Sequence, residues 1–184
     1  MTVVAPPDRM TVEQFLDHPS ADRHELVDGQ MTERSLSFES AWIAGKVFVR
    51  LDAYAVENGG TACGDGAELR CFGEEGRNVR KPDASFVRAG RLAGVPKTAC
   101  DVVPDVVVEV LPPGDRVYDV NEKLKTCREA GVPAVVVISP DTRVTTVHRG
   151  TASETVAEDE TLRLDDAMPG FALRLSDVLP PPSD

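Results

Sequence analysis

The chain has 184 residues, 41% of them hydrophobic, which favours one folded domain and excludes a disordered segment. Its longest apolar run, over 134–138, is far shorter than the roughly 20 residues of a membrane-spanning helix. Residues 1–20 contain no signal-peptide stretch, so we expect a cytoplasmic protein with no membrane partner. The net charge of −11 disfavours a dedicated nucleic-acid-binding module but is compatible with a site for a hard cation.

The first third of the chain predicts a short helix, a hairpin and a long helix. A T-x-x-Q capping box beginning at Thr11 predicts a helix that ends before Pro19. The dipeptide Asp28-Gly29 is typical of the tight turn of a hairpin, here with strands over 24–27 and 30–33. Apolar residues at helical spacing then predict a helix over 37–58.

Strands and one further helix are predicted in the middle of the chain. Residues 61–72 and 79–87 indicate two strands that are joined by a glycine-rich turn over 73–76. Residues 105–111 are apolar on both faces and therefore indicate a central strand. A helix over 119–130 follows, with Asp119 as its predicted N-cap.

The last third of the chain predicts mostly strands. Residues 134–138 indicate a second buried strand, and residues 143–149 a more polar strand nearer the sheet edge. Short strands or turns follow. The whole pattern predicts an α/β fold with a mixed sheet flanked by helices, as one domain over 1–179 with a proline-rich tail over 180–184.

Glu109 is the most unusual residue of this pattern, because it lies inside the apolar run over 105–111. Burial of an unpaired charge costs several kcal/mol, so the carboxylate must be paired, protonated, bound to a metal or exposed to a cleft. An ion pair with a nearby lysine or arginine, or a place at the solvent end of the strand, explains the residue without any function.

Asp83 and Lys123 are two further candidates. Asp83 follows Pro82, an arrangement that is also common in ordinary turns. At 100° per residue, Lys123 borders the apolar stripe of its helix, whereas Lys125 points toward solvent. Lys123 is therefore the lysine of this helix that could reach the two carboxylates, unless it extends to solvent.

These three residue types fit one chemistry when they are taken together. Two carboxylates from adjoining strands can hold Mg²⁺, or Mn²⁺ in its place, with the backbone carbonyl of Val110 as a third oxygen ligand. The metal ion would polarise a phosphodiester and lower the pKa of a bound water. The lysine ammonium would stabilise the hydroxide or the charge that develops on phosphorus.

Several ordered motifs carry a resemblance to a known family. Lys81-Pro82-Asp83-Ala84-Ser85-Phe86-Val87 and Pro104-Asp105-Val106-Val107-Val108-Glu109-Val110-Leu111 resemble the PD-(D/E)XK restriction-endonuclease-like superfamily, and more closely the bacterial Uma-two family of endonucleases. The opening His24-Glu25-Leu26-Val27-Asp28-Gly29, the pair Asp119 and Lys123 followed by Gly131-Val132-Pro133, and the closing Met168-Pro169-Gly170-Phe171 also match this family.

The resemblance implies a restriction-endonuclease-like core and metal-dependent hydrolysis of DNA. It assigns the metal carboxylates to Asp83 and Glu109. The superfamily's usual lysine position holds Leu111 here, so the resemblance implies that the lysine has moved to the following helix, as Lys123. Glu25 matches the carboxylate of the opening hairpin and is a further candidate ligand for metal or water. By analogy, cleavage of both strands of a duplex implies a homodimer.

Two other readings of the residues remain open. The first is a catalytically inactive restriction-endonuclease-like fold that acts as a dimeric interaction module, which the net charge of −11 favours. The second is a domain whose acidic pair is structural, which predicts a direct salt bridge at Glu109 and no bound metal. Basic residues that could contact phosphates are Arg70, Arg80, Lys81, Arg88, Arg91, Lys97 and Arg116.

Overall fold

The computed structural model of the chain describes residues 9–35, 37–73, 77–113 and 117–181, with only the backbone at 117–119. Its helices are α1 (Val12–Leu16), α2 (Phe38–Asn58) and α3 (Val117–Glu129), with short 3₁₀ turns at Ala21–Arg23 and Leu175–Asp177. The strands are β1 (His24–Val27), β2 (Gln30–Glu33), β3 (Thr61–Gly64), β4 (Ala84–Val87), β5 (Val106–Val110), β6 (Ala134–Ser139), β7 (Val144–Arg149), β8 (Ala152–Ala157), β9 (Thr161–Arg163) and β10 (Ala172–Arg174).

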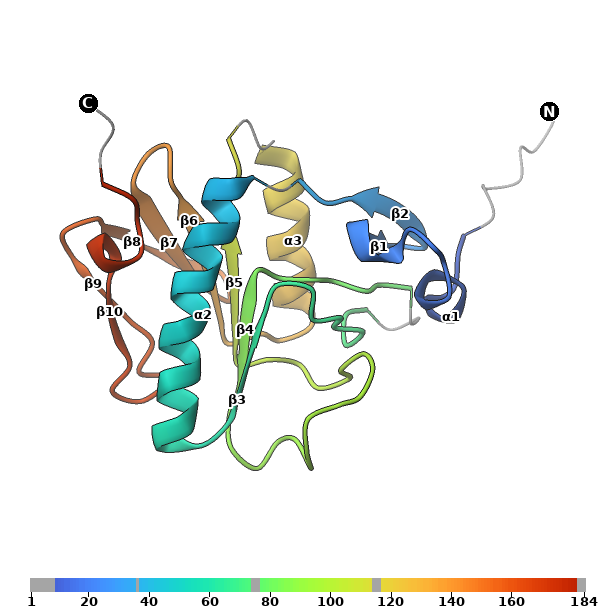
Figure 1. Cartoon of the computed structure of the whole chain (residues 1–184), viewed down its shortest axis with the longest axis horizontal. Helices are drawn as coiled ribbons and strands as arrows, with labels where there is room; N and C mark the ends of the chain where they lie inside the picture. The colour runs from blue at the N-terminus through green and yellow to red at the C-terminus, as the bar shows by residue number, and fades with distance from the viewer. Residues whose placement is uncertain (1–8, 36, 74–76, 114–116, 182–184) are drawn as a thin grey trace.

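A six-stranded mixed sheet forms the centre of the fold, in the order β3-β4-β5-β6-β7-β8. Only β5 and β6 are parallel, and the other neighbours pair antiparallel. Parallel neighbours need a crossover connection, and α3 supplies it. The predicted α/β fold with a mixed sheet flanked by helices is confirmed (Figure 1).

The two faces of the sheet are covered by different helices. Side chains alternate along a strand, so Val106, Val108 and Val110 pack into one core with the buried residues of α2. Val107 packs on the opposite face, in a second core with α3. Glu109 has the same parity as Val107, and its side chain therefore also points to the α3 face.

The N-terminal elements form a separate small cluster beside α3. The capping box at Thr11 and Gln14 is present at the start of α1, as predicted. The predicted hairpin is also confirmed, and both of its turn residues have positive φ, 48° at Asp28 and 77° at Gly29, as a type I′ turn requires. Leu26 of β1 packs against α1 and anchors the hairpin.

Three predicted boundaries are wrong. The strand expected over 61–72 ends at Gly64, because the turn at Asp65 and Gly66 (φ 87°) leaves the extended conformation. The strand expected over 79–87 begins only at Ala84, beyond Pro82, which cannot donate a ladder hydrogen bond. The third helix already includes Val117, so Asp119 lies inside it and is not its N-cap.

The C-terminal segment completes the core on the α2 face. The hairpin of β9 and β10 contributes Leu162 and Leu173 to the core that α2 covers, and the predicted short strands of this region are confirmed. Part of the predicted turn over 73–76 and of the predicted tail over 180–184 lies outside the described residues. In the described part of the chain, no helix is long and apolar enough to cross a membrane.

Candidate active site

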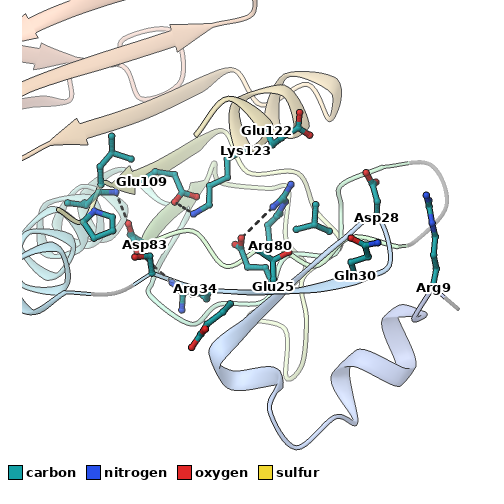
Figure 2. Close-up of a pocket in the computed structure, with 17 residues that line it drawn as sticks. Arg9, Glu25, Asp28, Gln30, Arg34, Arg80, Asp83, Glu109, Glu122 and Lys123 are labelled. Atoms are coloured by element: carbon teal, nitrogen blue, oxygen red, sulfur yellow. Dashed lines mark hydrogen bonds and ion pairs between the residues drawn. The ribbon is translucent and has the colours of Figure 1, made fainter. Parts of the chain in front are cut away.

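A pocket of about 380 Å³ lies between the β1–β2 hairpin, the end of β5 and α3 (Figure 2). The residues that the sequence singled out all line it, although they are up to 98 positions apart in the numbering: Glu25, Asp83, Glu109, Val110 and Lys123. The fold therefore brings the predicted candidates to one place.

Glu109 and Lys123 form a direct ion pair across this pocket. The alternation of β5 turns Glu109 toward α3, where the Lys123 Nζ donates to its Oε2 at 2.7 Å. Glu109 is only 8% exposed. Lys125 is exposed, as the helical angle predicted. Of these two lysines, the structure thus brings Lys123 to Glu109 and leaves Lys125 at the surface.

Asp83 immediately precedes β4 and is held by the strand beside it. Its Oδ2 accepts a hydrogen bond from the backbone N–H of Val110, at 2.6 Å. Its Oδ1 lies 3.6 Å from the Nη2 of Arg34, which also pairs with Asp65. Because Val110 follows Glu109 directly, this hydrogen bond fixes the two acidic side chains relative to each other.

Burial disfavours the ionised forms of the two carboxyl groups, Asp83 and Glu109. Burial raises the pKa of Asp83, although the Val110 N–H and the charges of Lys123 and Arg34 partly offset this effect. Burial also raises the pKa of Glu109 to about 7; Lys123 opposes the rise, and the nearby Asp83 and Glu25 add to it. A cation placed among these carboxylates would therefore be strongly stabilised.

The same surroundings keep Lys123 protonated. Burial alone would lower the pKa of its amine, but Glu109, Glu25 and Asp83 together outweigh burial and raise it. Asp83 and Glu109 both carry a raised pKa, while Lys123 beside Glu109 stays charged. Six carboxylates line the pocket, whereas its basic side chains are Arg9, Arg34, Arg80 and Lys123, so acidic groups outnumber basic ones among the lining residues.

Glu25 is buried in the same pocket, but its oxygens are already engaged. Its Oε1 accepts from the backbone N–H of Lys81 at 2.7 Å, and its Oε2 lies 3.5 Å from the Nη1 of Arg80. The Nη2 of Arg80 donates to the Oγ1 of Thr126 at 2.9 Å, one helical turn from Lys123. Arg80 therefore ties the hairpin to the helix that carries the lysine.

Arg34 and Arg80 are site residues that the sequence analysis missed in these roles. The sequence indicates Arg80 only as a basic residue that could contact phosphates, yet its Nε is buried and has no hydrogen-bond partner among the described residues. Arg34 has a side chain that is 6% exposed, and it contacts a carboxylate 49 positions away. Neither contact belongs to a helical or strand period, so no sequence signal could have indicated them.

Most of the other basic candidates do not face the pocket. Arg70 pairs with Asp101, Lys81 with Glu68, and Arg88 and Arg91 both pair with Asp105. Of the six basic candidates that the structure describes, only Arg80 lines the pocket, together with Arg9 and Arg34. Arg116 lies outside the described residues.

The donor set suits a hard cation that retains water. Asp83 and Glu109 offer carboxylate oxygens, the ligand type that Mg²⁺ prefers. Within the described ranges, no three His, Cys, Asp or Glu side chains form a metal-binding group. A metal ion here would need a backbone carbonyl, waters or substrate oxygens to complete its shell, as is usual for Mg²⁺ at phosphates. The role of Glu25 as a ligand stays a prediction.

Comparisons with known proteins agree with this architecture. Residues 12–176 match the model of the Uma2 family, described as "Putative restriction endonuclease". A crystal structure of "a putative nuclease belonging to DUF820 from Anabaena variabilis" matches with a TM-score of 0.77 and 17% identity. The match covers 92% of this chain and 97% of that chain, and at this identity it shows a shared fold. No curated protein matches the chain.

Proposed function

The chain belongs to the Uma2 family, described as "Putative restriction endonuclease", and from this membership we propose that it is a Mg²⁺-dependent DNA endonuclease. Hydrolysis of the phosphodiester would take place in the pocket that holds Asp83, Glu109 and Lys123. The convergence of these three side chains is the observation that carries the proposal.

Asp83 and Glu109 would hold the metal ion, together with the backbone carbonyl of Val110. When bound, the ion would polarise the phosphodiester and lower the pKa of a water that it binds. The Val110 N–H orients Asp83 at 2.6 Å, so one ligand is positioned before any ion arrives. Arg34 and Lys123 reduce the repulsion between the two carboxylates in the free protein.

Lys123 is the candidate for the catalytic lysine of a PD-(D/E)XK site, at a different sequence position from the usual one. The position two residues after Glu109 is Leu111, which lines the pocket but offers no ammonium. The Nζ of Lys123 lies 2.7 Å from Glu109 and approaches from α3 instead. From there the ammonium would stabilise the attacking hydroxide or the negative charge that develops on the phosphate oxygens.

A plasmid cleavage assay with matched variants tests this proposal. We expect supercoiled DNA to be nicked or linearised with Mg²⁺ or Mn²⁺, and Asp83→Asn and Lys123→Met to lower the rate by roughly 100-fold or more. Lys125→Met is the control, because it removes an exposed lysine from the same helix and should leave the rate within about twofold. Intact plasmid at every metal and pH tested, or cleavage that survives Asp83→Asn, would refute the proposal.

The second candidate is a non-catalytic interaction module. The net charge of −11 favours it, because it opposes the approach of a phosphate backbone. The direct salt bridge between Lys123 and Glu109 is the contact expected of a purely structural acidic pair, which would likewise bind no metal. Calorimetry distinguishes the two candidates: the endonuclease should bind Mn²⁺ with a heat that Asp83→Asn abolishes, whereas the module should give no heat. The homodimer and the cytoplasmic location are part of the proposal in either case.

A further inference from the structure

Arg34 enters the candidate active site from the segment after β2, and part of its guanidinium group is not engaged. Its side chain is only 6% exposed, and it lines the pocket that holds Asp83. Its Nη2 donates to Asp65 and lies 3.6 Å from the Oδ1 of Asp83. Its Nε and Nη1 donate to none of the described residues. Arg34 therefore has donors left for a ligand of the pocket.

The other basic side chains of the pocket are less suited to a ligand beside Asp83. The Nζ of Lys123 is engaged in an ion pair at 2.7 Å, and both terminal nitrogens of Arg80 have partners. Figure 2 shows Arg9 at the opposite end of the labelled residues from Asp83. Among the described residues of the pocket, Arg34 is thus the basic group that combines a place beside Asp83 with unengaged donors.

A guanidinium group in this position suits a phosphate. Its planar set of N–H donors matches the oxygens of a phosphate group better than a lysine ammonium does. The carboxylates that outnumber the basic groups of the pocket would repel a DNA backbone, so a phosphate there needs a cation of the protein beside it. Because Arg34 lies 3.6 Å from Asp83, a phosphate that binds beside Asp83 also lies beside Arg34.

Asp65 determines where the guanidinium lies. It is in the turn after β3, its side chain is 44% exposed, and it is not one of the described residues that line the pocket. Asp65 accepts a hydrogen bond from Arg34, whereas the 3.6 Å between Arg34 and Asp83 is longer than a hydrogen bond. Asp65 thus keeps Arg34 near Asp83 without a hydrogen bond to the Asp83 oxygen.

We propose that Arg34 binds a phosphate oxygen of the DNA backbone beside the proposed metal ligand Asp83, and that Asp65 is the positioning residue that keeps Arg34 from pairing directly with Asp83. The inference rests on the proposed function, because it names the residue with which the same pocket takes its substrate. Arg34 would offset part of the negative charge that the pocket presents to DNA.

Separate measurements of metal binding and DNA binding at pH 8.5 test the role of Arg34. Calorimetry gives the affinity for Mn²⁺, and fluorescence anisotropy of a short DNA duplex in Ca²⁺, another ion with oxygen ligands, gives the affinity for DNA. Arg34→Met should weaken DNA binding about tenfold or more and reduce the slope of log K against log salt by about 0.9, because one phosphate contact is lost. The same variant should bind Mn²⁺ at least as tightly as the wild type, because a positive charge beside Asp83 is removed.

Two further variants separate the loss of charge from the loss of the contact. Arg50→Met removes the same charge from an exposed ion pair with Asp177, and Arg50 is not one of the described residues that line the pocket. This control should leave the affinity for DNA within about twofold. Arg34→Lys keeps the charge without the planar set of donors and should recover only part of the lost affinity. Circular dichroism and thermal melting check that all variants fold.

Asp65→Asn tests the positioning role. Without the charge of Asp65, Arg34 should pair with Asp83, so that Mn²⁺ and DNA both bind more weakly, each by roughly fivefold. The double variant Arg34→Met/Asp65→Asn should recover the affinity for Mn²⁺ but not the affinity for DNA. Wild-type affinities in Asp65→Asn would overturn the positioning role.

The outcomes distinguish this inference from the proposed function. A loss of DNA affinity in Arg34→Met no greater than that in Arg50→Met would overturn the inference and leave the metal site in place. Equal losses of Mn²⁺ and DNA affinity in Arg34→Met would show that Arg34 only supports the structure of the site, which also overturns it. A wild type that binds neither Mn²⁺ nor DNA would overturn the proposed function, and this inference with it.

Discussion

The raised pKa of Glu109 predicts how the stability of the metal-free protein changes with pH. Glu109 is buried, and its pKa in the folded state is about 7, against 4.5 for the ordinary carboxyl group. At about 1.4 kcal/mol for each pH unit, this difference corresponds to about 3 kcal/mol of unfolding free energy. The protonated form is the one that folding favours.

The sign follows from the direction of that difference. A group whose pKa is raised in the folded state contributes stability below its unfolded pKa and loses it as the pH rises through its folded pKa. Glu109 should therefore lower the unfolding free energy between about pH 4.5 and pH 7. Asp83, whose pKa burial also raises, changes stability in the same direction, while Lys123 stays protonated throughout.

Urea denaturation from pH 4.5 to pH 8.5 with a chelator present measures the effect. Glu109→Gln keeps the shape of the side chain but cannot ionise, so we expect its stability relative to wild type to improve by about 3 kcal/mol over this range. Glu109→Gln also removes the ion-pair partner of Lys123, which shifts the unfolding free energy of the variant by an amount that stays constant over this pH range. If the unfolding free energies of the two proteins change with pH in parallel, the claim that ionised Glu109 destabilises the fold is refuted.

Three further predictions follow from the same contacts. Lys123→Met should destabilise the metal-free protein by about 3 kcal/mol at pH 8 in urea denaturation, because it leaves a buried carboxylate unpaired, whereas Lys125→Met should change stability by less than about 0.5 kcal/mol. Thr126→Val should cost about 1–2 kcal/mol in the same assay, since Arg80 loses a hydrogen-bond acceptor; an unchanged midpoint would contradict this. Mg²⁺ at 100 times its dissociation constant should add about 2.7 kcal/mol of stability in thermal melts, and none to Asp83→Asn; equal gains in both proteins would place the metal elsewhere.

Local patterns predicted most of the elements correctly. The capping box at Thr11 and the Asp28-Gly29 turn depend on contacts between near neighbours, and the structure reproduces both. The helix over 38–58 follows from its apolar period. The errors lie where a turn interrupts an extended segment, as at Gly66, whose positive φ ends the strand expected over 61–72.

The candidate site was predictable only in part. Glu109 stood out as a charge within an apolar strand, and the helical angle distinguished Lys123 from Lys125. The contacts of Arg34 and Arg80 link segments 46 or more positions apart, between Arg34 and Asp83 and between Arg80 and Thr126. Such contacts arise from the tertiary arrangement of the segments after β2, before β4 and along α3, which no periodicity in the sequence records.

Anomalous diffraction from crystals soaked in Mn²⁺ tests the central claim most directly. The account predicts a manganese peak bound by the side chains of Asp83 and Glu109, with its remaining ligands the Val110 carbonyl and water. Lys123 should then lie near the bound water. A structure at saturating Mn²⁺ in which Glu109 still pairs only with Lys123, and no peak lies beside Asp83, would contradict it.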